Sequence, residues 1–451
     1  MRKFLPYLIG FLLLVVGIVG ALFLLYHKQQ KESGPVVLHY VGLWDPDVIN
    51  PLKLEYQKSH PNVIIEYEQK EKDRYFSYLD KALAGKNPPD LFWWHNGWGP
   101  VMAQKLASMP ATTYSEADYE KIFYPITKAD LKISGSYRGI PLEIDGLVLA
   151  YNKDLLAAKG LTTPPADLIS LKTNYAPNLT VLDGTGQVVS GGVALGATNN
   201  VENFSEILGL FMLQNKVTFI KNRQNALAKN ITLDGRNLAA DALSVYNSFL
   251  YADKVWSKAL PPSVEAFAEG KVAMIYLPAY RFVDLKDYLD QKNLKLNFGV
   301  STVPQLVSSE PVTWGSYWAQ GVAASSKHAT QAWDFAKFLS EKASLRKLYG
   351  NETKIRKVGR AYPRVDMAKE QASDPLIFPF VTQAPYAKGW YLYSDGGDDQ
   401  LNGKIVDIFA KRIAESPSGA DQLGTINNIT KDIQPILESF GLVLPLPKQT
   451  Q

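Results

Sequence analysis

After residue 35, hydrophobic and polar positions follow the periods of alternating strands and helices. Residues 36–41 form a β-branched and aromatic run typical of a buried strand, and apolar residues at helical spacing follow it. Residues 63–67 alternate as a second strand, and Asp73 opens a helical pattern that stops at Gly85. This strand-helix-strand-helix order predicts an α/β fold that starts with a parallel sheet.

The same periods return further along the chain. Residues 91–94 are a short apolar run after the chain break at 87–90, and they predict a third buried strand. An Asp-Gly-Thr-Gly sequence at 183–186 predicts a hairpin in a region, 161–260, that we assign to a second lobe. Further strand-like segments lie at 140–151, 272–277 and 298–300, and helical ones at 204–213, 239–250 and 332–343.

Two of the predicted strands end in loops that combine tryptophan with polar residues. Trp44 and Asp45 follow the first strand. Trp94 ends the third strand, and His95 and Asn96 follow it. In open α/β sheets ligands bind beyond the carboxyl ends of the strands. We therefore expect both loops to contact a ligand.

An uncharged apolar run precedes the globular part. It covers residues 4–26, and a membrane-spanning helix needs roughly 20 such residues. The apolar core of a cleaved signal peptide is shorter, about 7–15 residues, so the length favours an uncleaved anchor over a signal. Basic residues flank the run on both sides, and charge alone does not fix its orientation. Residues 27–35 form a polar spacer.

Composition limits the class of protein. With the apolar run set aside, about 400 residues remain, which favours two domains. Hydrophobic residues at 46% and charged residues at 20% fit a folded soluble part. The net charge of +4 is scattered along the chain, so we expect no nucleic-acid partner. The chain has no cysteine, which excludes disulfides, thiolate chemistry and a lipid-modified cysteine.

Motifs for catalysis and for metal or phosphate binding are missing from the sequence. The five histidines are widely separated, and neither an HExxH motif nor a glycine-rich phosphate loop occurs. The acidic stretch 395–399 lacks the ligand register of a calcium loop and is typical of a helix start. We therefore predict no catalytic residues, no metal and no cofactor. Glu143 and Asp145 are the one carboxylate pair that a glycosidase could use, but a hinge or ligand role is favoured.

Aromatic residues in polar, glycine-containing contexts are abundant. Sugars present flat C–H faces ringed by hydroxyls, and aromatic rings beside carboxylates or amides bind such ligands. Core packing is the alternative for any single ring, because tryptophan is usually buried. The residues concerned are Trp44, Trp94, Trp98, Tyr280, Trp314, Tyr317, Trp318, Trp390 and Tyr391.

Several segments together resemble the family 1 extracellular solute-binding proteins, and the maltodextrin-binding branch in particular. They occur in the family's order and span nearly everything after residue 36. The segments are KNPPDLFWWHN at 86–96, with the strand and sugar-stacking tryptophan of the family; Asp145 before YNKD at 151–154, like the first hinge crossing; FAEGKVAMIYLPAY at 267–280; FGVSTVP at 298–304; AWDFAKFLS at 332–340; and Trp390-Tyr391, like the aromatic pair that closes the cleft.

The resemblance implies a two-lobe fold of the periplasmic-binding-protein type (type II) with a hinge, here preceded by one N-terminal transmembrane helix. It implies hinge crossings at 144–146 and 313–315. The first lobe would comprise 36–143 and 316–349, and the second 147–312 and 350–440. Since the chain lacks the cysteine that anchors many relatives, the apolar run would tether a globular part outside the cytoplasm.

For function, the resemblance implies a monomeric receptor that binds a small molecule, a carbohydrate, and delivers it to an ABC permease. Tyr280 stands where a stacking tryptophan is common in the family, and the loop 95–98 is one residue short. The predicted ligand-binding residues are Trp44, Asp45, Trp94, His95, Asn96, Asp145, Tyr280, Trp314, Tyr317, Trp390 and Tyr391. The alternatives left open are a membrane-anchored glycan-acting enzyme, a sensor or adhesion module, and a binding protein for a solute other than a sugar.

Overall fold

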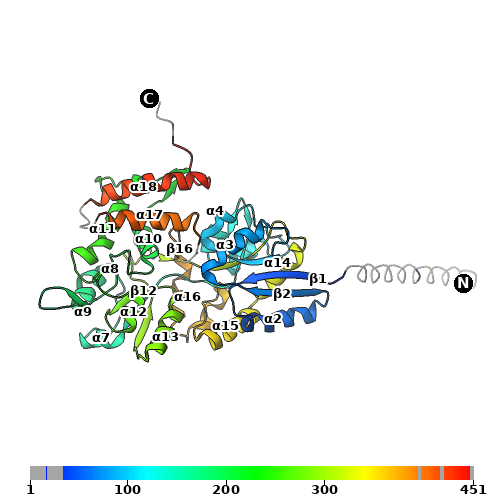
Figure 1. The fold of residues 1–451 in the computed structure, drawn as a ribbon, viewed down its shortest axis with the longest axis horizontal. Coiled ribbons are helices and arrows are strands. Elements are labelled where there is room, and N and C mark those ends of the chain that lie inside the picture. The colour runs from blue at the N-terminus through cyan, green and yellow to red at the C-terminus, as the bar shows by residue number, and fades with distance from the viewer. Residues whose placement is uncertain (1–16, 18–33, 395–397, 417–420, 447–451) are drawn as a thin grey trace, which may run out of the picture.

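The protein folds into two α/β lobes that lie side by side (Figure 1). The computed structural model describes residues 17, 34–394, 398–416 and 421–446. Apart from Gly17, the predicted membrane span 4–26 lies outside these residues and stays a prediction. Within the described part of the chain, no helix is long and apolar enough to cross a membrane.

A five-stranded sheet forms the centre of the first lobe. Strand β1 (Val36–Gly42) pairs in parallel with β2 (Val63–Gln69) on one side and β3 (Leu91–His95) on the other. The later strand β15 (Trp318–Val322) lies antiparallel between β3 and β6 (Ile140–Pro141). The three strands predicted at the start of the chain and their parallel pairing are thus confirmed. The antiparallel strands β15 and β6 come from later parts of the chain.

Helices cover this sheet where the apolar period predicted them. The carboxylate of Asp45 caps the first helix by accepting a hydrogen bond of 2.8 Å from the backbone N–H of Asp47. The elements of this lobe are α2 (Pro46–Ser59), α3 (Lys72–Leu83), α4 (Gly99–Met102), α5 (Glu116–Ile122), α6 (Ile126–Leu131), the hairpin β4 (Lys132–Ile133) and β5 (Ser136–Tyr137), α14 (Ala329–Leu339) and α15 (Lys342–Arg356).

The second lobe is built on three antiparallel strands. Strand β7 (Val148–Asn152) lies between β12 (Met274–Leu277) and β13 (Phe298–Ser301). The hairpin predicted at 183–186 connects β8 (Val181–Leu182) and β9 (Val188–Ser190). The other elements are α7 (Lys153–Ala158), α8 (Leu168–Ser170), α9 (Ala176–Leu179), α10 (Phe204–Gln214), β10 (Ile220–Lys221), β11 (Gln224–Asn225), α11 (Leu238–Tyr251), α12 (Ser263–Ala268), α13 (Arg281–Lys292), α17 (Asn402–Ala414) and α18 (Gln422–Ser439).

The chain passes between the lobes through neighbouring extended segments. The strand-like segment 140–151 divides around the predicted crossing 144–146, because β6 belongs to the first sheet and β7 to the second. Between them, Gly146 forms a β-bridge with Gly315. Strand β14 (Thr313–Trp314) pairs in parallel with β16 (Ala387–Lys388). The two segments predicted as hinge crossings therefore lie side by side.

A third connection follows later than the predicted lobe boundary. The division expected after residue 349 falls inside α15, which packs against α2 and holds it through a 3.1 Å hydrogen bond from Asn351 to the carbonyl of Val48. Ala361 still bridges to Ile144. The chain reaches the second lobe at α16 (Phe378–Gln383). There the side-chain amide of Gln383 donates a hydrogen bond to the carbonyl of Leu147, the residue before β7.

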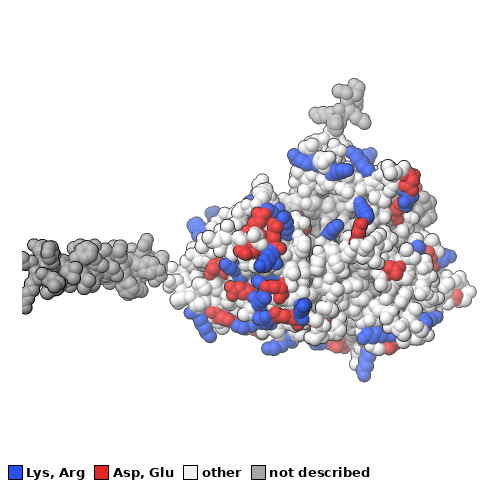
Figure 2. Space-filling view, turned by 180° about the vertical axis from the view of Figure 1, so that it is seen from behind, with Lys and Arg blue, Asp and Glu red and all other residues white. Residues whose placement is uncertain are grey.

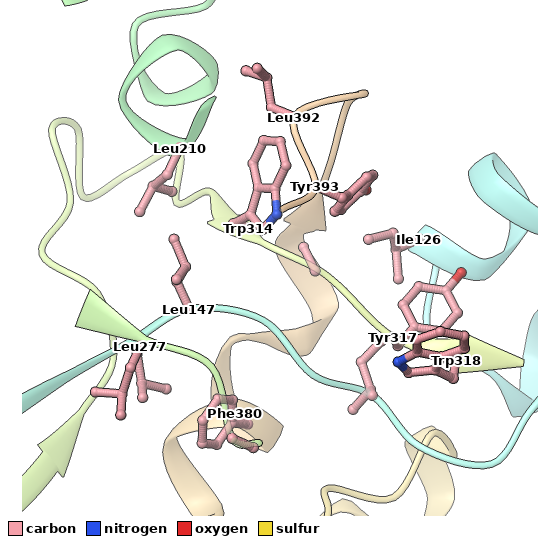
Figure 3. Close-up of a cluster of buried hydrophobic side chains, with 14 of the residues drawn as sticks. Ile126, Leu147, Leu210, Leu277, Trp314, Tyr317, Trp318, Phe380, Leu392 and Tyr393 are labelled. Carbon is pink, nitrogen blue, oxygen red and sulfur yellow. The ribbon is translucent and has the colours of Figure 1, made fainter. Parts of the chain in front are cut away.

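An apolar cluster fixes the place where the connecting segments meet (Figure 3). Trp314 is fully buried there, close to Leu210 of α10, and its ring lies 5.2 Å from that of Tyr393. Leu147 of the first crossing and Phe380 of α16 belong to the same cluster. The connecting segments are therefore packed into the same continuous hydrophobic core as the two lobes.

Candidate functional site

A cleft of about 620 Å³ opens between the lobes, a size within the usual range for small-molecule sites. The first lobe, the hinge and the second lobe all contribute side chains to it. Those that matter most are Trp44, Asp45, Lys72 and Trp318 from the first lobe, Glu143, Asp145 and Ser316 from the hinge, and Tyr280, Arg281 and Ser394 from the second lobe.

Three aromatic rings line the cleft, and two of them pack against other rings of the first lobe. Trp44 stands edge-on to Trp93, with ring centres 4.4 Å apart. Trp318 makes the same kind of contact with Trp98 at 5.1 Å. The indole N–H of Trp44 has no hydrogen-bond partner among the described residues. These rings, with Tyr280 opposite, give the cleft apolar surfaces whose orientation is fixed before a ligand arrives.

Two hinge carboxylates are held by the protein itself. Asp145 accepts hydrogen bonds from the backbone N–H groups of Ala279 at 2.8 Å and Gly146 at 2.6 Å, and burial raises its pKa to about 7. Glu143 forms an ion pair with Arg360, while burial raises its pKa as well. These contacts tie the hinge to both lobes and fix the orientation of the two carboxyl groups at the cleft.

One contact of the cleft joins the two lobes directly. The ammonium group of Lys72, the first residue of α3, lies 3.8 Å from the ring centre of Tyr280 in the second lobe. The guanidinium of Arg281, the first residue of α13, lies 5.2 Å from the same ring. Burial, together with the nearby Arg281 and Arg360, lowers the pKa of Lys72 to about 8.

Of the eleven predicted ligand-binding residues, Trp44, Asp45, Asp145 and Tyr280 line this cleft. Trp94 does not: it is fully buried in the first lobe. A Cβ atom at Gly139 would lie 2.9 Å from the Trp94 indole nitrogen, and one at Gly321 would lie 2.7 Å from its Cδ1. The two glycines thus form a slot for the indole within the core.

His95 and Asn96 are buried in the first lobe and do not line the cleft. His95 is buried, its Nε2 is 3.0 Å from the hydroxyl of the cleft residue Ser316, and burial lowers its pKa to about 3. It is therefore neutral at physiological pH. The side-chain amide of Asn96 donates to Asp130 at 2.8 Å and to the Tyr393 hydroxyl at 2.9 Å. Both residues support the cleft rather than line it.

The remaining four predicted residues also lie outside the cleft lining. Trp314 and Tyr317 are fully buried at the hinge. Trp390 stacks on Phe219 with ring centres 4.2 Å apart, and Tyr391 lies against Trp390 at 5.6 Å. In this arrangement of the lobes their rings pack against the protein.

Sequence reasoning did not select several residues that the fold brings into the cleft. Lys72 and Arg281 each begin a helix, where a charged residue is usually solvated, and only the tertiary structure places them on one ring. Trp318 belonged to the predicted aromatic group without being chosen as a ligand contact. Its position at the start of β15, next to the hinge, was the available signal.

On the face shown in Figure 2, acidic and basic side chains are intermixed over the first lobe. Neighbouring charges of opposite sign largely cancel beyond a Debye length of about 10 Å. The charges on this face therefore exert little long-range attraction on a charged ligand.

Two α/β lobes joined by neighbouring extended segments around a lined cleft define a ligand-binding protein with a hinge. The sequence matches the family model for bacterial extracellular solute-binding proteins over residues 52–375, more than half of the chain. The chain therefore belongs to this family.

Individual relatives are distant. A binding protein of Brucella abortus (strain 2308) is 21% identical over 389 residues, which cover 84% of this chain and 90% of the relative. A maltotriose-binding protein of Pyrococcus abyssi is 27% identical over 157 residues, 33% of each chain. The crystal structure of a cyclic alpha-maltosyl-1,6-maltose binding protein from Arthrobacter globiformis is similar, with a TM-score of 0.70 and 18% identity, covering 90% of this chain and 100% of the other. This likeness shows the two-lobed fold.

Proposed function

We propose that the chain is the extracytoplasmic receptor of an ABC importer and binds a mono- or oligosaccharide in the interlobe cleft without changing it chemically. The observation that carries the proposal is the set of fixed rings, Trp44, Trp318 and Tyr280, next to the hinge carboxylate Asp145. Rings can cover the C–H faces of a sugar while the carboxylate accepts from its hydroxyls. The maltotriose- and maltose-derived ligands named for two relatives support the same class.

The direct test is a thermal-shift screen of the purified chain against monosaccharides, oligosaccharides, amino acids and polyamines. A ligand that binds only the folded state raises stability by about 2.7 kcal/mol at 100 times its Kd. We expect a shift with at least one saccharide family. A shift with amino acids or polyamines alone would keep the family and overturn the ligand class.

Replacing Tyr280 with alanine should weaken saccharide binding by about 1–3 kcal/mol, the scale of one lost aromatic contact. Isothermal titration calorimetry with the saccharide found in the screen measures the effect. Tyr288→Ala is the matched control, because Tyr288 lies on α13, the helix that Tyr280 precedes, but outside the cleft lining, where its hydroxyl donates to Glu269. Equal affinities of the two variants would contradict the assignment of the cleft.

We also propose that residues 4–26 anchor the chain in the membrane and that the anchor holds the receptor near its permease. The support is the length of the uncharged run. In membranes from expressing cells, the full chain should resist extraction with alkaline carbonate, while a chain that begins at Val36 should be released. Extraction of the full chain would contradict the anchor and leave the binding function untouched.

A further inference from the structure

The imidazole of His95 lies between a backbone N–H group and a hydroxyl of the cleft. Its Nδ1 accepts a hydrogen bond of 3.1 Å from the backbone N–H of Gly97, and its Nε2 lies 3.0 Å from the hydroxyl oxygen of Ser316. A backbone N–H can only donate, so Nδ1 carries no proton. Burial lowers the pKa of His95 to about 3, so the ring is neutral and its one proton is on Nε2. His95 therefore donates to Ser316.

The surroundings of His95 keep the direction of this hydrogen bond fixed. The imidazole is fully buried and stands edge-on to the rings of Trp318 and Tyr393, with ring centres 5.1 Å and 5.0 Å away. The backbone N–H of Ser316 donates to the carbonyl of Asp145 at 2.9 Å, which ties Ser316 to the first crossing. Turning the imidazole by 180° would replace both bonded nitrogens with C–H groups and break both hydrogen bonds.

The hydroxyl proton of Ser316 is left without an acceptor in the part of the chain that the structure describes. The contact with His95 uses a lone pair of the Ser316 oxygen, and this hydroxyl forms no second hydrogen bond within the described ranges. Ser316 lines the cleft, where an acceptor atom of a ligand can reach the proton. A donor that is itself hydrogen-bonded from behind is also the stronger for it, because chains of hydrogen bonds polarise one another.

Ser394, which lines the same cleft from the second lobe, has the opposite polarity. Its hydroxyl donates to Oε1 of the buried Glu206 at 2.7 Å, and its backbone N–H donates to the same oxygen at 2.7 Å. The hydroxyl of Ser205 donates to the other carboxylate oxygen at 2.9 Å. Since the proton of Ser394 is used by Glu206, its hydroxyl offers a ligand only lone pairs.

Resting on the proposed carbohydrate-binding function, we propose that Ser316 contacts the bound saccharide as a hydrogen-bond donor to one hydroxyl oxygen, and that His95 is the positioning residue that fixes this direction. A saccharide hydroxyl can accept as well as donate, so it completes a chain that runs from His95 through Ser316 to the sugar. The cleft thus presents a donor at the hinge and an acceptor at Ser394. This pattern distinguishes saccharides by the placement of their hydroxyl groups.

The first measurement needs no ligand. Long-range nitrogen–proton NMR spectra of the full chain in mild detergent, with histidine labelled by nitrogen-15, report which imidazole nitrogen of His95 carries the proton. His95→Gln assigns the signal, because it removes that histidine alone. We expect a proton on Nε2, none on Nδ1, and no change of protonation between pH 8 and pH 5.

The second measurement reads the polarity of Ser316 by isothermal titration calorimetry. The probes are glucose, maltose, maltotriose and mannobiose, followed by the monodeoxy and monofluoro analogues of the one that binds most tightly. Fluorine accepts a hydrogen bond weakly and cannot donate, whereas a deoxy position does neither. At one position we expect the fluoro analogue to bind at least threefold more tightly than the deoxy analogue.

Variants then assign this difference to Ser316. Ser316→Ala should weaken binding of the parent saccharide about three- to tenfold, the scale of one hydrogen bond, and abolish the advantage of the fluoro analogue. Ser394→Ala removes a cleft hydroxyl of the opposite polarity and should leave that advantage in place. Ser340→Ala, whose buried hydroxyl bonds within the first lobe outside the cleft lining, should leave the affinity unchanged.

Two replacements of His95 separate its positioning role from its place in the core. Asparagine keeps an acceptor for Gly97 but is too short to donate to Ser316, while the longer glutamine amide can donate to it. We therefore expect the fluoro advantage to be lost in His95→Asn and kept in His95→Gln. Circular dichroism checks that the variants fold.

A proton on Nδ1 of His95, or a charged ring at pH 7, would overturn the positioning role whatever the variants do. Equal binding of fluoro and deoxy analogues at every position, or a fluoro advantage that survives Ser316→Ala, would overturn this inference and keep the proposed function. Absence of binding by all four saccharides, with a thermal shift from an amino acid or a polyamine, would overturn the proposed function itself.

Discussion

Replacing Trp94 with alanine should lower the free energy of unfolding by about 3–5 kcal/mol, the usual cost of truncating a fully buried aromatic side chain. Trp94 has no exposed surface, and it fills the slot beside Gly139 and Gly321 in the sheet of the first lobe. Ala319 of the neighbouring strand β15 is the pairing partner of Trp94 in the sheet. Truncation would therefore leave a cavity in the core next to this pair of strands. Urea denaturation followed by circular dichroism measures the loss.

The binding of ligand by the folded fraction of this variant should be nearly unchanged, because Trp94 lies outside the cleft lining. Trp94→Phe is the control, since it keeps an aromatic ring in the slot and should lose less stability than alanine. A variant with wild-type stability and weakened ligand affinity would show that Trp94 contacts the ligand after all.

This residue also shows how far the sequence alone reaches. The apolar run 91–94 correctly predicts a buried central strand, yet the same pattern cannot say which aromatic side chain faces a ligand. Successive side chains of a strand point to opposite faces, and here both faces are covered, so Trp93 and Trp94 are both buried. Trp44 lies beyond the end of its strand, where the position itself indicates the cleft.

The local pattern of apolar and polar residues could not predict which distant segments of the chain pack together. The segment 140–151 is strand-like throughout, but its two halves join different sheets. The first half pairs with β15 and the second with β12, and both partners are distant in the sequence. Likewise, α15 continues past residue 349 because its apolar face packs on α2. The two cations on Tyr280 come from helix starts in different lobes, and no local spacing connects them.

Replacing Arg360 with methionine should cost about 3–5 kcal/mol of stability, as expected when one partner of a buried ion pair is removed. Glu143 and Glu352 are each 3% exposed, and the Arg360 guanidinium bonds to both of them. Glu352 keeps Arg356 as an ion-pair partner at 3.1 Å, so Glu143 is the carboxylate that loses its ion pair. Arg346→Met is the matched control: its pair with Glu370 is exposed and should contribute under about 1 kcal/mol. Urea denaturation compares the two variants.

The pH dependence separates this electrostatic cost from simple loss of packing. Burial already raises the pKa of Glu143, and without the nearby guanidinium its pKa should rise further. The folded variant then binds more protons than its unfolded chain above the unfolded pKa of about 4.3, so its stability deficit relative to wild type should shrink as the pH falls towards 4. Adding Glu143→Gln removes the buried charge and should recover part of the loss at neutral pH. A deficit that is independent of pH and unchanged in the double variant would mean that Arg360 acts through packing, including its contact with the Trp93 ring at 5.6 Å, rather than through its charge.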